Sequence, residues 1–125
     1  MQTNINIDLP TDFVELCRYS DETPEAVFQS FANQMSFPKF LTTQDRNERL
    51  ATYFFIEHIQ SPEFTGEISE SLEDHYFPLL HTVVKESFEK YPNDREKAMK
   101  AARKVMKLWS EAAVAERRRK QDDDM

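Results

Sequence analysis

The chain has 125 residues and 39% hydrophobic residues, which suits one globular domain or one domain with a small appendage. Its single glycine excludes glycine-rich phosphate loops, dinucleotide fingerprints and turn-rich β-sandwiches, which need glycine at positive φ. Its net charge of −7 is unfavourable for non-specific nucleic-acid binding, and its single cysteine excludes an internal disulfide.

At the N-terminus, residues 4–9 alternate polar and apolar side chains, a periodicity that predicts a short β-strand with one apolar face. Pro10 ends this segment. Alternatively, residues 4–9 form an extended arm that lies on a helical bundle. The apolar face would consist of Ile5, Ile7 and Leu9.

Two helices are predicted after the strand. Thr11 or Asp12 is expected to cap a short helix to about Ser20, with Cys17 on its inner face as a buried apolar residue. A second helix to about Ser36 is indicated by a capping hydroxyl followed by proline at the first helical position, Thr23 and Pro24.

The order of strand, short helix, tight break and helix within residues 4–36 resembles the ribbon-helix-helix fold of small repressors and antitoxins. The resemblance implies an obligate homodimer in which two chains pair their strands, with Ile5, Ile7 and Leu9 facing the helices. It also implies that the alternate side chains Asn4 and Asn6 read bases in the DNA major groove. Thr23 would mark the helix start at which backbone N–H groups hold a phosphate.

The rest of the chain is predicted to be helical. Residues 1–37 would form the strand-helix-helix module, residues 38–44 a connector, residues 45–120 a helical domain and residues 121–125 an acidic tail. A helix from Thr42 or Thr43 to about Ile59 is expected to be the most buried. Its apolar side chains cover more than half its circumference, namely Leu50, Tyr53, Phe54, Phe55, Ile56 and Ile59.

A further helix is predicted from Glu67 to about Tyr91, kinked or split at Pro78 because proline breaks the backbone hydrogen-bond pattern. Asn93 is expected to cap the last helix, which reaches about Arg119. One side of that helix forms a heptad-like seam, a candidate surface for a protein partner, of Met99, Ala102, Met106, Trp109 and Ala113. The opposite side is a solvated face or a patch for DNA or another acidic partner, with Lys97, Lys100, Lys104 and Lys107.

The sequence contains no recognisable catalytic, cofactor-binding or metal-binding pattern. Its three histidines, His58, His75 and His81, lack the spacing of a shared metal site. Several aromatic residues could line a small-molecule pocket, but aromatics at helical spacing belong to a core more often: Tyr53, Phe54, Phe55, Phe77 and Phe88. We therefore expect a protein that is not an enzyme and has no cofactor.

These observations lead to two hypotheses for a cytoplasmic protein without membrane segments. In the first, a ribbon-helix-helix-like homodimer acts as a DNA-binding regulator or accessory protein through Asn4, Asn6, Thr23 and the lysine face. In the second, the chain is a helical protein-interaction or scaffold protein that uses Met99, Met106 and Trp109 and binds no nucleic acid.

Overall fold

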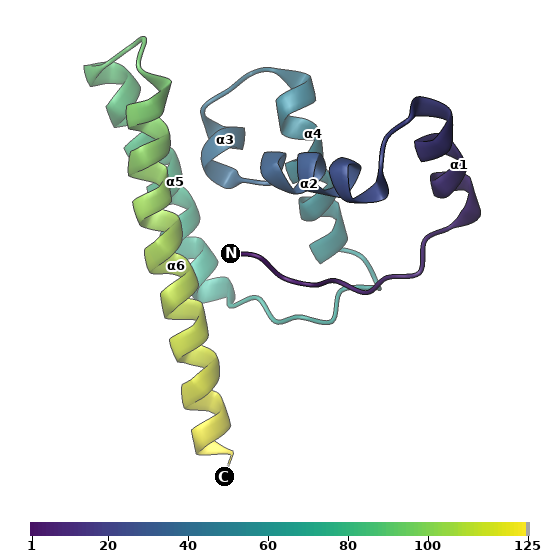
Figure 1. Ribbon diagram of the computed structural model, residues 1–125. Helices are drawn as coiled ribbons and strands as arrows, with labels where there is room; N and C mark the ends of the chain where they lie inside the picture. Colours follow the sequence, from purple (N-terminus) through teal and green to yellow (C-terminus); the bar gives the residue numbers. More distant parts are fainter. Residues whose placement is uncertain (125) are drawn as a thin grey trace. The chain divides into compact units, whose positions relative to one another are not determined.

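The computed structural model describes residues 1–124, in which six α-helices are the regular elements (Figure 1). The chain divides into two compact units, residues 1–33 and a second unit that begins at Gln34. None of the helices in the described residues combines the length and the apolar character that crossing a membrane would require.

The chain is mainly helical, but the predicted N-terminal strand is wrong. Residues 1–10 contain no regular element, and no β-strand occurs anywhere in residues 1–124. The side chains of the proposed apolar face are exposed, at 74% for Ile5 and 54% for Ile7. Alternation produces a strand only where a neighbouring strand accepts the backbone hydrogen bonds, and the described residues offer no such neighbour.

The first unit contains α1 (Thr11–Ser20) and α2 (Pro24–Gln34), except for the last residue of α2, which belongs to the second unit. Helix α1 begins directly after Pro10 without a side-chain cap, so the predicted capping by Thr11 or Asp12 is wrong. Between the helices, Asp21 adopts a left-handed conformation with φ of 55° and donates its N–H to a carbonyl of the preceding turn. The predicted start of α2 is confirmed, because the Thr23 hydroxyl accepts the Ala26 N–H at 3.1 Å. Cys17 is buried, as expected.

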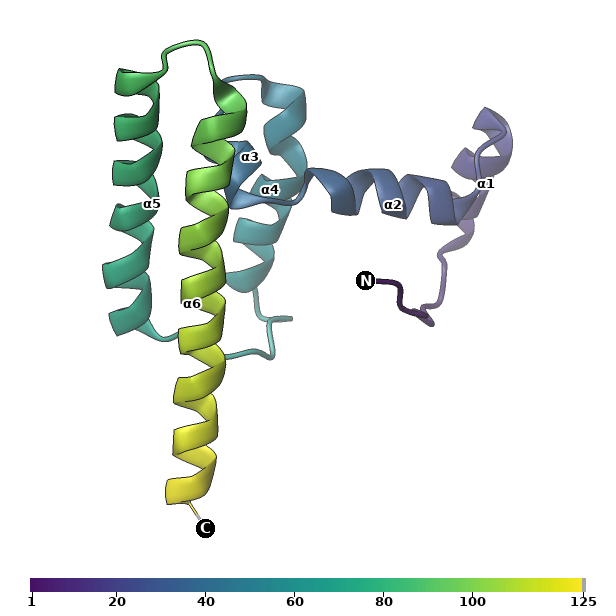
Figure 2. The same ribbon diagram turned by 60° about the vertical axis from the view of Figure 1, so that its left-hand side comes forward.

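The second unit is organised around an antiparallel pair, α5 (Glu70–Lys90) and α6 (Arg95–Asp123), which lie side by side in Figure 2. Helix α5 continues through Pro78 as one element, so the predicted split there does not occur. Asp94, rather than the predicted Asn93, caps α6 by accepting the Lys97 N–H at 3.1 Å. The core consists mostly of small and medium-sized residues, which allow the helices to approach closely: Leu80, Val84, Ala98, Ala102 and Val105.

Two further helices of this unit are α3 (Phe37–Leu41) and α4 (Arg46–Ile59). Helix α3 occupies the segment expected to be a connector, because Ser36 caps it and Pro38 lies in its first turn. Helix α4 is not the most buried helix. Its buried residues are Ala51 and Thr52, whereas Leu50 is 64% exposed and three aromatic residues are also exposed, namely Tyr53, Phe54 and Phe55.

Candidate functional site

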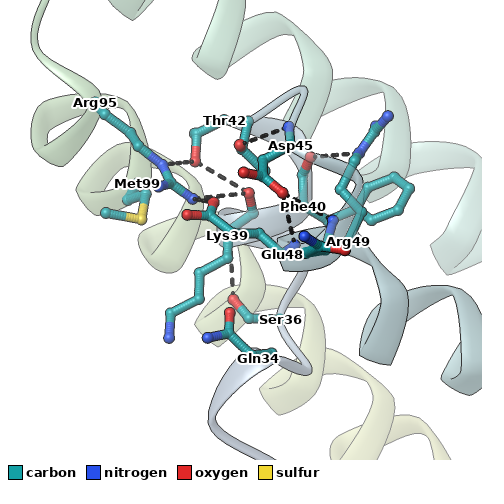
Figure 3. Close-up of polar contacts among 12 residues, drawn as sticks. Gln34, Ser36, Lys39, Phe40, Thr42, Asp45, Glu48, Arg49, Arg95 and Met99 are labelled. Carbon is teal, nitrogen blue, oxygen red and sulfur yellow. Dashed lines mark hydrogen bonds and ion pairs between the residues drawn. The ribbon is translucent and has the colours of Figure 1, made fainter. Parts of the chain in front are cut away.

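Polar contacts join the end of α3 and the start of α4 to α6. The Arg95 side chain, in the first turn of α6, donates from Nε to the Thr42 hydroxyl at 3.0 Å. Its Nη2 atom donates to the Lys39 carbonyl oxygen at 3.3 Å and lies 2.9 Å from the Glu48 carboxylate (Figure 3). One guanidinium thus contacts two helices and the turn between them, a geometry that suits its planar set of donors.

A buried hydroxyl fixes the other side of α4. Thr52 is 2% exposed, and its Oγ1 accepts the Ser36 N–H at 2.9 Å. The same hydroxyl lies within hydrogen-bonding distance of the Gln34 and Ser36 carbonyl oxygens, to which it can donate its single proton. Arg49 adds a contact on the same helix, with its guanidinium 3.9 Å from the centre of the Phe40 ring. Helix α4 is therefore held at its polar and small residues.

An apolar groove of about 560 Å³ lies in the second unit, where α4 stands away from the α5–α6 pair. Residues from five segments line it. Those from α3 and α4 include Phe37, Phe55, Ile56 and Ile59; those from the 60–69 loop and the start of α5 include Phe64, Ile68, Leu72 and Phe77; those from α6 include Met106, Trp109 and Ala113. We call this surface the α4–α6 groove.

The floor of the α4–α6 groove is an aromatic cluster centred on Trp109. Its indole stacks on Phe37 with ring centres 6.2 Å apart and on Tyr76 with ring centres 6.1 Å apart. Phe77 meets Trp109 in an edge-on arrangement, with ring centres 6.5 Å apart. Aromatic pairs in these arrangements stabilise one another beyond the area that they bury. The floor is therefore formed by aromatic contacts within the chain itself.

The 60–69 loop lines the groove and bonds to the last turns of α6. Lys120 Nζ lies 2.7 Å from the Glu67 carboxylate, and the Ser69 hydroxyl donates to Glu116 at 3.2 Å. The hydrogen bond and charge of Lys120 lower the pKa of Glu67, and Glu67 correspondingly raises the pKa of Lys120. These charged groups therefore engage each other at the rim.

The single glycine of the chain has a packing role in this loop. Gly66 does not have positive φ, but a Cβ atom there would lie 2.8 Å from the Phe64 ring. Phe64 itself lines the groove. A larger residue at position 66 would displace that ring, so the glycine helps to set the shape of the groove.

The groove is lined mainly by apolar residues, together with six polar or charged residues, three of which bond within the chain. Its rim groups Glu67 and Ser69 are bonded to α6, and the Ser110 hydroxyl donates to the Lys107 carbonyl at 3.0 Å. Within residues 1–124, no three histidine, cysteine or acidic side chains gather closely enough to hold a metal ion. The arrangement is therefore suited to binding apolar side chains.

The structure separates the residues predicted to form one partner seam. Met106 and Trp109 line the groove, whereas Met99 is buried in the unit. Lys97, Lys100, Lys104 and Lys107 are all exposed on α6. Asn4 and Asn6 are exposed in the segment without regular structure, and Thr23 caps α2. The structure therefore does not gather the proposed DNA-reading and phosphate-binding residues on a common strand-and-helix element.

Sequence reasoning missed most of the opposite wall of the groove, which includes Ile59, Phe64, Ile68 and Leu72. Of the aromatic residues suggested for a pocket, Phe55 and Phe77 do line the groove. The proline and glycine in residues 60–69 indicated a loop, but nothing local in the sequence showed that it meets α6.

No protein-family model, curated protein or solved structure matches this chain.

Proposed function

We propose that the chain is a non-enzymatic protein-interaction module whose α4–α6 groove binds an amphipathic helix of a partner protein. The observation that carries this proposal is the apolar floor of the groove, in which Trp109 stacks on Phe37 and on Tyr76. Grooves of this kind accept apolar side chains spaced three or four residues apart on a helix. The proposal is a sharper form of the second sequence hypothesis, because Met106 and Trp109 belong to the predicted seam.

A peptide helix fits this site better than a polar small molecule. Small-molecule sites usually combine an apolar lining with a few convergent polar groups that fix the ligand's orientation. In this groove, three of the polar lining residues, Glu67, Ser69 and Ser110, already bond to their own chain. An apolar side chain can occupy the space without leaving those polar groups unsatisfied.

DNA binding and homodimer formation remain predictions. The ribbon-helix-helix hypothesis required a strand from which Asn4 and Asn6 would read bases, and residues 1–124 contain no strand. The excess of acidic residues over the whole chain also opposes contact with a phosphate backbone. The groove therefore supports the interaction module more directly than any described feature supports a DNA-binding protein.

Trp109 is the only tryptophan in the chain, so its fluorescence reports on the floor of the groove without labelling. We would select helical peptides from a displayed random library against the full chain and measure their binding by Trp109 emission. Selected peptides are expected to carry apolar residues at helical spacing and to shift that emission.

Two groove variants and a matched control test the location of binding. Ile68→Glu places a carboxylate in the lining, and Ala113→Phe fills the groove with apolar volume. Each should weaken binding by at least about tenfold, which corresponds to roughly 1.4 kcal/mol. Val114→Glu is the control, because Val114 has the same 41% exposure as Ile68 but does not line this groove. Peptides that bind Ala113→Phe as tightly as the unmodified chain would contradict the proposal.

A further inference from the structure

A second surface of the unit, the outward side of α6, carries an unusual concentration of positive charge. Between positions 97 and 110 the helix contains five basic residues and no acidic residue. All five are exposed: Lys97, Lys100, Arg103, Lys104 and Lys107. At about 100° per residue, these side chains face away from Ala98, Ala102 and Val105, which pack in the core. We call this surface the α6 basic face.

Three of these lysines have no ionic partner among residues 1–124. Lys97 is engaged locally, since its Nζ atom lies 3.7 Å from the centre of the Tyr91 ring and 4.0 Å from Asp94. In contrast, Lys100, Lys104 and Lys107 form no ion pair in the described part of the chain. They are three, four or seven residues apart, so neighbouring like charges repel along the helix. Negative charge from outside would relieve that repulsion.

The exposed side chain of Leu108 indicates which class of acidic molecule the α6 basic face would bind. Leu108 is 54% exposed and lies four residues, about one turn, after Lys104 on the same side of α6. The phosphate backbone of a nucleic acid would gain little binding free energy from contact with a leucine side chain. In addition, residues 1–92 hold sixteen acidic and six basic residues, which would repel an extended polyanion. An acidic protein segment with an apolar side chain complements both features.

We propose that the α6 basic face is a second docking surface, which binds an acidic segment of a partner protein with an apolar side chain placed on Leu108. The face lies on the side of α6 away from the groove floor formed by Met106 and Trp109, so it does not depend on the α4–α6 groove. Lysine charges steer the acidic segment and the leucine fixes its register.

Fluorescence anisotropy of labelled peptides with the full chain would test this proposal. The probe is an 18-residue helical peptide with glutamates at every fourth position and one leucine on the same side (a length of about 27 Å). A control peptide has glutamine in place of every glutamate. A 20-base-pair DNA duplex and light scattering of the chain alone represent the other possible occupants, nucleic acid and a second copy.

The glutamate peptide should bind and the glutamine peptide should not. The double variant Lys100→Glu/Lys104→Glu should reduce affinity by at least about tenfold, and Leu108→Ala by a smaller factor of about three. Arg118→Glu/Arg119→Glu changes charge equally outside the face and should have little effect. Circular dichroism would establish that each variant remains helical.

Four results would overturn the proposal. The first is equal binding of the two peptides, and the second is an equal loss in the Arg118/Arg119 control. Tighter binding of the duplex than of the glutamate peptide would assign the face to nucleic acid. Self-association of the chain that disappears in Lys100→Glu/Lys104→Glu would assign it to a second copy.

Discussion

Helices α4 and α6 both carry many apolar side chains, yet they use them in opposite ways. Helix α6 buries Ala98, Met99, Ala102 and Val105 against its neighbours. Helix α4 buries Ala51 and Thr52 and leaves Leu50 and its aromatic residues exposed. The difference shows that the number of apolar residues on a helix does not decide how deeply it is buried. Small residues allow two helices to approach closely, and that approach determines what is buried.

The same difference produces the candidate site. Helix α6 packs along α5, whereas α4 is attached through Thr52 and through the contacts of Glu48 with Arg95. Polar contacts at these points hold α4 in place without closing the space between it and α6. The groove follows from that spacing, and the following predictions test it from the largest expected effect to the smallest.

The largest effect should come from matched leucine substitutions in the two regions. Leu80→Ala removes a side chain with 0% exposure from the core of the α5–α6 pair and should lower the free energy of unfolding by about 2–5 kcal/mol. Leu50→Ala removes the same atoms from the exposed side of α4 and should change the free energy of unfolding by less than about 0.5 kcal/mol. Urea denaturation of both variants measures the two losses, and equal losses would show that Leu50 is as well packed as the core of the α5–α6 pair.

A smaller effect is expected at the polar attachment of α4. Thr52→Val keeps the shape of the side chain but leaves the Ser36 N–H without its partner, which should cost about 1–3 kcal/mol of stability. Thr65→Val in the exposed loop provides the matched control and should be nearly neutral. Urea denaturation is again the measurement. No loss in Thr52→Val would mean that apolar contacts, rather than this hydroxyl, hold the helix.

Replacing the guanidinium of Arg95 should have a more modest effect. Arg95→Lys retains the charge but cannot contact Thr42, Lys39 and Glu48 together, and should reduce stability by about 1 kcal/mol. Hydrogen exchange should show faster opening of α4 than of the α5–α6 pair. Arg46→Lys, on an exposed residue at the start of α4, is the control. Uniformly faster exchange in all helices would argue against a local attachment.

The smallest effect concerns the pH dependence of the 60–69 loop that lines the groove. Lys120 lowers the pKa of Glu67 below its ordinary value of 4.5, so the folded chain favours the ionised carboxylate. This contribution is present above that ordinary value and is lost as the pH falls through the lowered pKa. An NMR titration of Glu67 should therefore show a lowered midpoint that returns towards normal in Lys120→Met. Glu63→Gln, in the same loop, should leave the midpoint unchanged, and an unchanged midpoint in Lys120→Met would exclude the pairing.

Several elements could be predicted from short-range signals. Thr23 and Pro24 marked the start of α2 because a hydroxyl cap and a proline at the first turn act within four residues. Proline was a less reliable signal, since Pro78 lies inside α5 without splitting it, and Pro38 lies in α3, where a connector was predicted. In α5, Leu80 and Val84, two and six residues after the proline, pack in the core, and such packing can offset the lost backbone hydrogen bond.

The candidate site was only partly visible in the sequence. The spacing of Met106 and Trp109 singled out a surface of the last helix as a partner seam, and both residues line the groove. The same pattern included Met99, which is buried. Helical periodicity identifies one side of a helix, but it does not show where along its length a neighbouring helix ends or diverges.

The amino-acid sequence by itself determined the mainly helical character of the chain, the start of α2 and the lysine side of α6. These features depend on backbone propensity, capping and periodicity, which act over a few residues. Only the tertiary structure decided that residues 4–9 form no strand, that α4 is exposed and that a groove separates it from α6. A strand needs a partner, and burial needs a neighbouring element, so both depend on residues far away in the sequence.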